Sequence, residues 1–147
     1  MQLELIISEF DFWIKENIRI ARIKSNVDQV QLSHRLGVSE GYIGNIENLK
    51  NRAKPNTRMI SRIAYALNLN TYQDLFPKQV LKNDVVSIKL ELLKTNTRKQ
   101  IVNDNGEVPE RFNLMSIEPL SQDEINRWHI LKKPHLIDAK LRKRIFK

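Results

Sequence analysis

The pattern of apolar and polar positions predicts several short helices in the first half of the chain. Between about residues 10 and 76 the helical spacing indicates helices over 14–24, 29–36, 39–47, 57–67 and 72–76. In the first of these helices the apolar side chains share one face, whereas Lys15 and Arg19 fall elsewhere. Short polar residues that can accept a hydrogen bond from a helix-start amide precede the others: Asn26 or Asp28, Ser39, Asn56 or Thr57, and Thr71.

A tight turn separates two of these helices. Gly37 follows residues 29–36, where a left-handed residue is expected after a helix C-terminus. A three- to four-residue turn containing glycine between two short helices is typical of the helix-turn-helix motif. In that motif the second helix, here residues 39–47, enters the major groove of DNA.

The two ends of the chain follow other patterns. Residues 1–13 are rich in apolar side chains and fit either a helix or a short strand, so we expect them to be buried against the domain or a partner chain. Alternation around residues 86–92 predicts a strand, and a turn signal at 103–106 precedes a return strand over 112–117. Ser121 to Glu124 forms a capping box that predicts one more short helix.

These patterns predict a mainly α fold. A five-helix DNA-binding bundle is expected to carry a smaller C-terminal extension, made of a β-hairpin and a short helix. The chain then divides into an apolar N-terminal extension (1–13), a helix-turn-helix domain (14–77) and a C-terminal extension with a basic tail (78–147).

Charge and composition narrow the function classes. A net charge of +8 and a pI of about 9.8 favour a polyanionic partner such as nucleic acid. The chain has no cysteine, no run approaching the ~20 apolar residues of a membrane span, and no basic signal-peptide start. We therefore expect a cytoplasmic protein without a membrane partner. The histidines lack metal-ligand spacing and no catalytic or cofactor motif occurs, so we expect neither an enzyme nor a metal nor a cofactor.

Residues 14–76 resemble the DNA-binding domain of the Cro/repressor-type (XRE-like) helix-turn-helix regulators. The resemblance implies a five-helix, repressor-like bundle that works as a homodimer on double-stranded DNA. It is carried, in chain order, by Ile18…Ala21-Arg22, Gln29-x-x-Leu32-Ser33, Leu36-Gly37-Val38-Ser39, Ile43-x-x-Ile46-Glu47-Asn48, Ile63-Ala64-x-Ala66-Leu67 and Asp74-Leu75.

The resemblance also implies roles for individual residues. Gln29, at a helix start, corresponds to a phosphate contact, and free amides there suit an anion. Asn45 is the best direct reader, because its amide can pair bidentately with adenine. Arg22 and Glu47 match a structural ion pair between the first and third helices. The positions from which family members reach phosphates and base edges are Ser39, Glu40, Gly41, Tyr42 and Asn45.

Basic residues follow the predicted recognition helix. Their place suits phosphate contacts beside the groove, although a solvated loop is the alternative; they are Lys50, Arg52, Lys54 and Arg58. The recognition helix itself departs from the family pattern at Glu40, Gly41 and Gly44, and Leu49 stands where glycine is common.

We interpret the chain as a sequence-specific DNA-binding transcriptional regulator, a repressor that reads the major groove with the helix 39–47. The alternative is an antitoxin-type protein that binds a partner protein through residues 78–147 and represses its own operon. For the basic tail, 132–147, we favour accessory DNA contacts over a solvated tail or an acidic protein partner.

Overall fold

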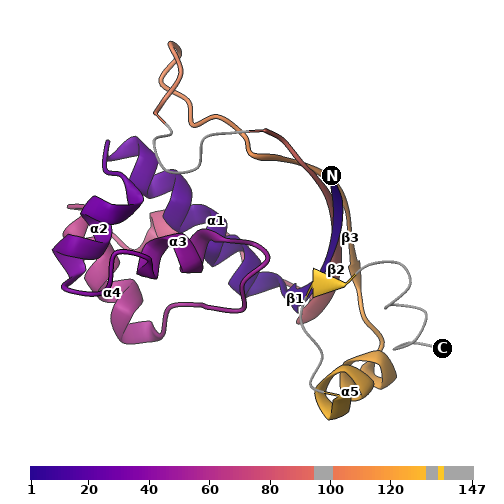
Figure 1. Cartoon of the computed structure of the whole chain (residues 1–147). Coiled ribbons are helices and arrows are strands. Elements are labelled where there is room, and N and C mark those ends of the chain that lie inside the picture. Colours follow the sequence, from indigo (N-terminus) through magenta and orange to yellow (C-terminus); the bar gives the residue numbers. More distant parts are fainter. Residues whose placement is uncertain (95–100, 132–135, 138–147) are drawn as a thin grey trace.

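The chain folds into a helical bundle beside an antiparallel sheet, with helix α1 (Glu9–Lys24) running from one to the other (Figure 1). The computed structural model describes residues 1–94, 101–131 and 136–137, and the side chains of 1–94 and 101–127. The bundle also contains α2 (Gln29–Leu36), α3 (Tyr42–Glu47), α4 (Thr57–Ala66) and the 3-10 turn η1 (Gln73–Leu75). The rest comprises β1 (Gln2–Ser8), β2 (Val85–Leu92), β3 (Phe112–Pro119), α5 (Gln122–Leu131) and β4 (Leu136–Ile137).

Local capping explains where several helices begin and end. Asp28 accepts from the Gln31 amide at 2.7 Å, and the Gln31 side chain accepts from the Asp28 amide at 2.9 Å, which fixes the start of α2. Gly37, at a φ of 68°, ends that helix in the left-handed conformation that glycine adopts without strain. The Asn56 side chain likewise caps α4, and Ser121 and Glu124 form the capping box before α5.

Three helix boundaries differ from those predicted. The first helix begins at Glu9 rather than residue 14, because the Ser8 side chain caps it through the Asp11 amide at 3.3 Å. Helix α3 begins at Tyr42, three residues after the predicted start, and Ser39 accepts through its backbone carbonyl instead of its side chain. The last predicted helix, 72–76, is a single 3-10 turn.

The sheet joins the two ends of the described chain. Its strand order is β3-β2-β1-β4, and all three pairings are antiparallel. The predicted hairpin is therefore present as β2 and β3, but β1 extends it along its whole length, from Gln2 opposite Glu91 to Ser8 opposite Val85. A mainly α description fits the bundle and not the whole chain, because residues 2–8 form a strand.

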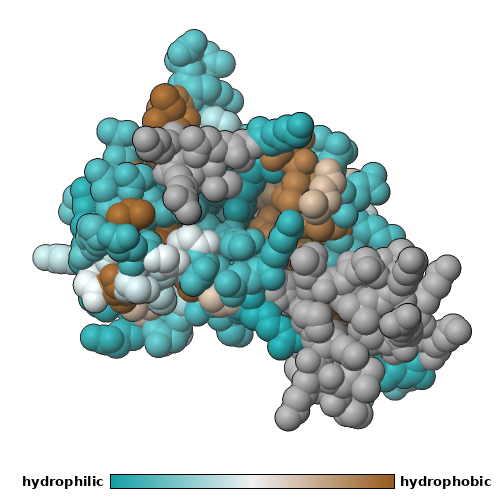
Figure 2. Space-filling model, viewed as in Figure 1, coloured by the Kyte–Doolittle hydropathy of each residue, from teal (hydrophilic) through white to brown (hydrophobic). Residues whose placement is uncertain are grey.

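Two apolar clusters hold the structure together. The first lies between the bundle helices and includes Ile18, Leu32 and Ile63, each 0% exposed. The second lies between the sheet and the first turn of α1, around Leu5, Phe12, Ile88 and Leu90. Apolar spheres gather over the sheet in Figure 2, whereas the surface over the bundle is mostly hydrophilic.

Leu49 connects the two parts of the molecule. It lies two residues after the end of α3, is 4% exposed, and belongs to the sheet cluster. The residue that departs from the family pattern at this position is therefore a core residue. Its burial fixes the chain leaving α3 against the sheet.

Candidate nucleic-acid interface

Helices α2 and α3 are joined by a buried hydroxyl. Ser33 is 0% exposed; its side chain donates to the Gln29 carbonyl at 3.0 Å and accepts from the Ile43 amide at 3.2 Å. The Ile43 amide lies in the first turn of α3, where helical amides have no partner within the helix. One side chain of α2 thus fixes the start of α3, and buried Ile43 and Ile46 anchor its inner face.

A buried ion pair holds the other end of α3. The structure brings Arg22 and Glu47 together: Arg22 Nε donates to Glu47 Oε2 at 2.6 Å and Nη2 donates to Oε1 at 2.9 Å. Both residues are at most 1% exposed, and Arg22 Nη1 also donates to the Val27 carbonyl at 2.9 Å. This two-point geometry is the arrangement in which arginine binds a carboxylate most strongly.

Gln29 lies against α3. Its Nε2 atom donates to Glu47 Oε1 at 3.2 Å, and its Oε1 atom lies 3.2 Å from the position that a Cβ on Gly44 would occupy. The absence of a side chain at Gly44 therefore leaves room for the Gln29 amide. In this conformation the side chain of Gln29 supports α3, and its role as a phosphate contact stays a prediction.

The outward side of the turn and of α3 carries polar side chains. Ser39, Glu40, Gly41 and Asn45 are all exposed, and Glu40 lies 3.2 Å from His34 Nε2. The Asn45 side chain makes no hydrogen bond to another described residue. An exposed amide on this helix can pair with a base edge without first giving up a protein partner.

Tyr42 is positioned differently from its neighbours. Its ring is half-buried against the bundle core, and this burial raises the pKa of the phenol, while the nearby Arg62 lowers it. The Arg62 guanidinium itself donates to the Leu36 carbonyl at the end of α2. The Tyr42 ring therefore contributes to the packing of the bundle, and a contact of its hydroxyl with DNA stays a prediction.

The basic residues after α3 are exposed and spread along the loop and into α4. These side chains are Lys50, Arg52, Lys54 and Arg58. Lys54 forms an ion pair with Asp11 in the first turn of α1, with 3.0 Å between Nζ and Oδ2. The Asp11 carboxylate therefore partly neutralises the charge of Lys54.

Sequence reasoning missed a buried polar cluster on α1. Lys15 and Arg19, expected outside the apolar face, are 1% and 2% exposed, because the loop after α3 and residues 109–111 cover that side of the helix. Lys15 Nζ donates to the carbonyls of Asn51 and Ala53 at 2.6 and 3.0 Å. Arg19 also pairs with Glu16, three positions away, but the carbonyls that accept from Lys15 and Arg19 lie 36 to 90 positions away, so no local sequence signal could have revealed the burial.

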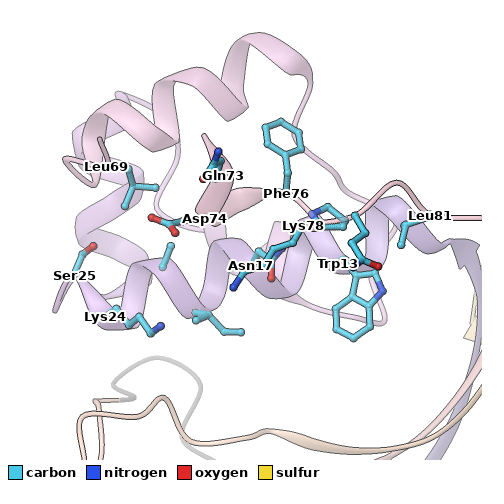
Figure 3. Close-up of a pocket in the computed structure, with 14 residues that line it drawn as sticks. Trp13, Asn17, Lys24, Ser25, Leu69, Gln73, Asp74, Phe76, Lys78 and Leu81 are labelled. Atoms are coloured by element: carbon cyan, nitrogen blue, oxygen red, sulfur yellow. The ribbon is translucent and has the colours of Figure 1, made fainter. Parts of the chain in front are cut away.

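A groove of about 670 Å³ lies on the other side of α1 (Figure 3). Trp13, Asn17 and Lys24 line it from α1, at a spacing that places them on one helical face, and residues of the segment 69–81 line it from across. Arg22 falls on the opposite face of α1. None of the predicted DNA contacts lines this groove, which is therefore separate from the outward face of α3.

The predicted basic tail lies outside the described residues, apart from the strand β4. None of the described helices is long and apolar enough to cross a membrane.

The comparisons with known proteins agree with this geometry. Residues 18–72, from the middle of α1 to the start of η1, match the family model described as "Helix-turn-helix". Searches of the curated proteins and of the solved structures gave no match. The matched segment contains α2, the turn at Gly37, α3, and both residues of the Arg22–Glu47 pair. Residues 18–72 thus form a helix-turn-helix domain of the Cro/repressor (XRE-like) family, and the chain is a DNA-binding transcription regulator.

Proposed function

We propose that this regulator binds a specific DNA sequence by inserting α3 into the major groove and represses transcription there. The observation that carries the proposal is the two-sided character of α3: Ile43, Ile46 and Glu47 are buried and fixed, whereas Asn45 is exposed. A rigidly held helix with a free polar side chain meets the geometric requirement for direct readout.

The positive charge supports the same proposal. The net charge of +8 favours association with the DNA backbone, and exposed Lys50, Arg52 and Arg58 lie on the segment that follows α3. Contacts of this kind fix the protein on the duplex, whereas contacts from α3 read its sequence. Lys50→Ala is expected to weaken binding to all DNA sequences. It should also lower by about one the magnitude of the salt slope, which is the slope of the logarithm of the binding constant against the logarithm of the salt concentration.

A homodimer is part of the proposal. One module of this size reads only a short half-site, and two-fold symmetric operators reflect two-fold symmetric proteins. Selection of bound duplexes from a random pool tests sequence reading and dimerisation together. We expect enrichment of a two-fold symmetric motif. A pool that stays random after repeated rounds would contradict specific reading.

The direction of regulation needs its own measurement. The selected motif is placed so that it overlaps a promoter, and transcription is measured with and without the protein. Repression predicts fewer transcripts, and a promoter carrying a scrambled motif serves as the control. An increase in transcripts from the intact motif would identify an activator.

A protein partner is the second candidate, and an edge strand favours it. In the described sheet β3 is paired on one side only, and Leu114 and Met115 on it are 43% and 54% exposed. An exposed apolar edge strand can pair with a strand of another chain. This candidate predicts a stoichiometric complex with a protein encoded beside the regulator, abolished by Leu114→Lys. A complex unaffected by that change would exclude β3 as its surface.

A further inference from the structure

One buried arginine connects the hairpin to the recognition helix. Arg111 lies at the entry to β3 and is 8% exposed. Its Nη1 atom donates to the backbone carbonyl of Glu47 at 2.7 Å, and its Nε atom donates to Glu16 Oε2 at 3.0 Å. A single side chain thus joins β3, α1 and the last residue of α3.

The hairpin side of this connection is itself fixed. Glu16 shares its other oxygen with Arg19 at 2.7 Å, and Arg19 Nη2 donates to the Pro109 carbonyl at 2.7 Å. The carbonyl of Arg111 accepts from the Leu93 amide at 2.9 Å, just after β2. The backbone around Arg111 is therefore tied both to α1 and to the neighbouring strand.

The other side of the connection is a helix that needs external support. Helix α3 has six residues, one of them Gly44, and helices this short are not stable by themselves. The carbonyl of Glu47 is one of the last four in α3, which have no partner within the helix. Arg22 holds the carboxylate of Glu47 and Arg111 holds its carbonyl, so two arginines distant in sequence fix one residue.

The contribution of Arg111 to the stability of the fold is reduced by the cost of burying its guanidinium. Arg111 Nη2 is buried and has no hydrogen-bond partner among the described residues. Glu16 would keep Arg19 as its partner without Arg111. Burying an incompletely paired guanidinium is costly, and this cost offsets part of what its two hydrogen bonds contribute to stability.

We propose that Arg111 is a positioning residue for DNA recognition. Acting through the Glu47 carbonyl, it fixes the C-terminal end of α3, so that the β2–β3 hairpin contributes to reading the operator without touching DNA. The inference rests on the proposed function, that α3 reads a specific sequence. It adds that the chain beyond residue 77 helps to set the orientation of α3.

The test compares Arg111→Met with the wild-type chain on the selected motif and on scrambled duplex. Loss of a charge-assisted hydrogen bond predicts specific affinity lower by about 10- to 100-fold. Affinity for scrambled DNA and the salt slope should change little, because Arg111 is buried and contacts no phosphate. Amide hydrogen exchange over residues 42–47 should become faster.

Two further variants separate positioning from general destabilisation. Ile88→Val removes a methyl group from the sheet cluster and no hydrogen bond to Glu47. It should leave unchanged both the ratio of the affinities for motif and scrambled duplex and the hydrogen exchange of α3. Arg111→Lys keeps one ammonium donor for the Glu47 carbonyl. Its ratio of motif to scrambled-duplex affinity should therefore lie between those of Arg111→Met and the wild type. If Arg111→Met does not fold, Arg111→Lys is judged by the same ratio, which must then lie below the wild-type value.

The outcomes distinguish this inference from the proposed function. A wild-type chain that binds motif and scrambled DNA equally would refute the proposed function and the inference with it. A wild-type preference that the arginine variants retain in full would refute the inference alone. An equal loss of preference in Ile88→Val would show that general hairpin stability, and not the contact to Glu47, is responsible.

Discussion

Replacing one partner of the Arg22–Glu47 pair should destabilise the domain by several kcal/mol. In Glu47→Leu the Arg22 guanidinium, 0% exposed, loses the carboxylate that it contacts at 2.6 and 2.9 Å. Removing one partner of a buried pair costs about 3–5 kcal/mol, because the remaining charge is desolvated and unpaired. Stabilities of single domains are about 5–15 kcal/mol, so this loss is a large share of the total.

Urea unfolding followed by circular dichroism measures the loss. With a slope of about 2 kcal/mol per M, the midpoint of Glu47→Leu should fall by about 2 M. The double variant Arg22→Met/Glu47→Leu buries neither charge and should lose less than either single variant. Lys54→Ala removes an exposed pair, with the side chain of Lys54 62% exposed, and should cost less than about 1 kcal/mol.

The DNA consequence follows from the position of the pair. Below its unfolding transition, Glu47→Leu should bind the selected motif more weakly, because α3 loses the support of both Arg22 and Gln29. A loss of stability below about 1 kcal/mol, or single-variant losses that simply add in the double variant, would refute the view that this pair holds α3.

Three further predictions follow from buried contacts. Burial lowers the pKa of Lys15 to about 8 from its ordinary 10.5, so the unfolded chain binds more protons between these values. The stability of wild type relative to Lys15→Met should therefore rise by at most about 3 kcal/mol from pH 8 to 10.5, and a flat difference in urea titrations would contradict this. Gly44→Ala should stabilise α3 by about 1 kcal/mol in a Gln29→Ala background and by less in wild type, where the new Cβ meets Gln29 Oε1; equal gains in thermal unfolding would exclude that contact. Leu49→Ala should cost about 2–5 kcal/mol in urea unfolding, and a loss below 1 would place Leu49 outside the sheet core.

Local chemistry made much of the bundle predictable. The capping box at Asp28, the left-handed glycine at Gly37 and the cap at Asn56 each depend on residues within a few positions. The helix-turn-helix motif follows from such signals, together with a helical period of apolar side chains. The predicted start of α3 was wrong by three residues. Ser39 was expected to cap the helix with its side chain, but it accepts from the Tyr42 amide through its backbone carbonyl.

Contacts between distant residues were beyond such reasoning. The period-two pattern of β2 predicts a strand, but nothing in residues 2–8 indicates that they pair with it 83 positions later. Lys15 and Arg111 look like surface residues in sequence, since their burial depends on carbonyls that only the folded chain brings near. The contact between the hairpin and α3 therefore emerged only from the structure.

Repeating the DNA selection with Asn45→Ala tests the central claim most directly. If α3 reads the groove with Asn45, the enriched motif should keep its two-fold symmetry and lose an adenine preference at one position of each half-site. A bidentate contact gives about 1–3 kcal/mol of discrimination, or about 5- to 150-fold between bases. Lys50→Ala, the matched control, should weaken binding and leave the motif unchanged. An Asn45→Ala motif identical to that of the wild type would contradict the account.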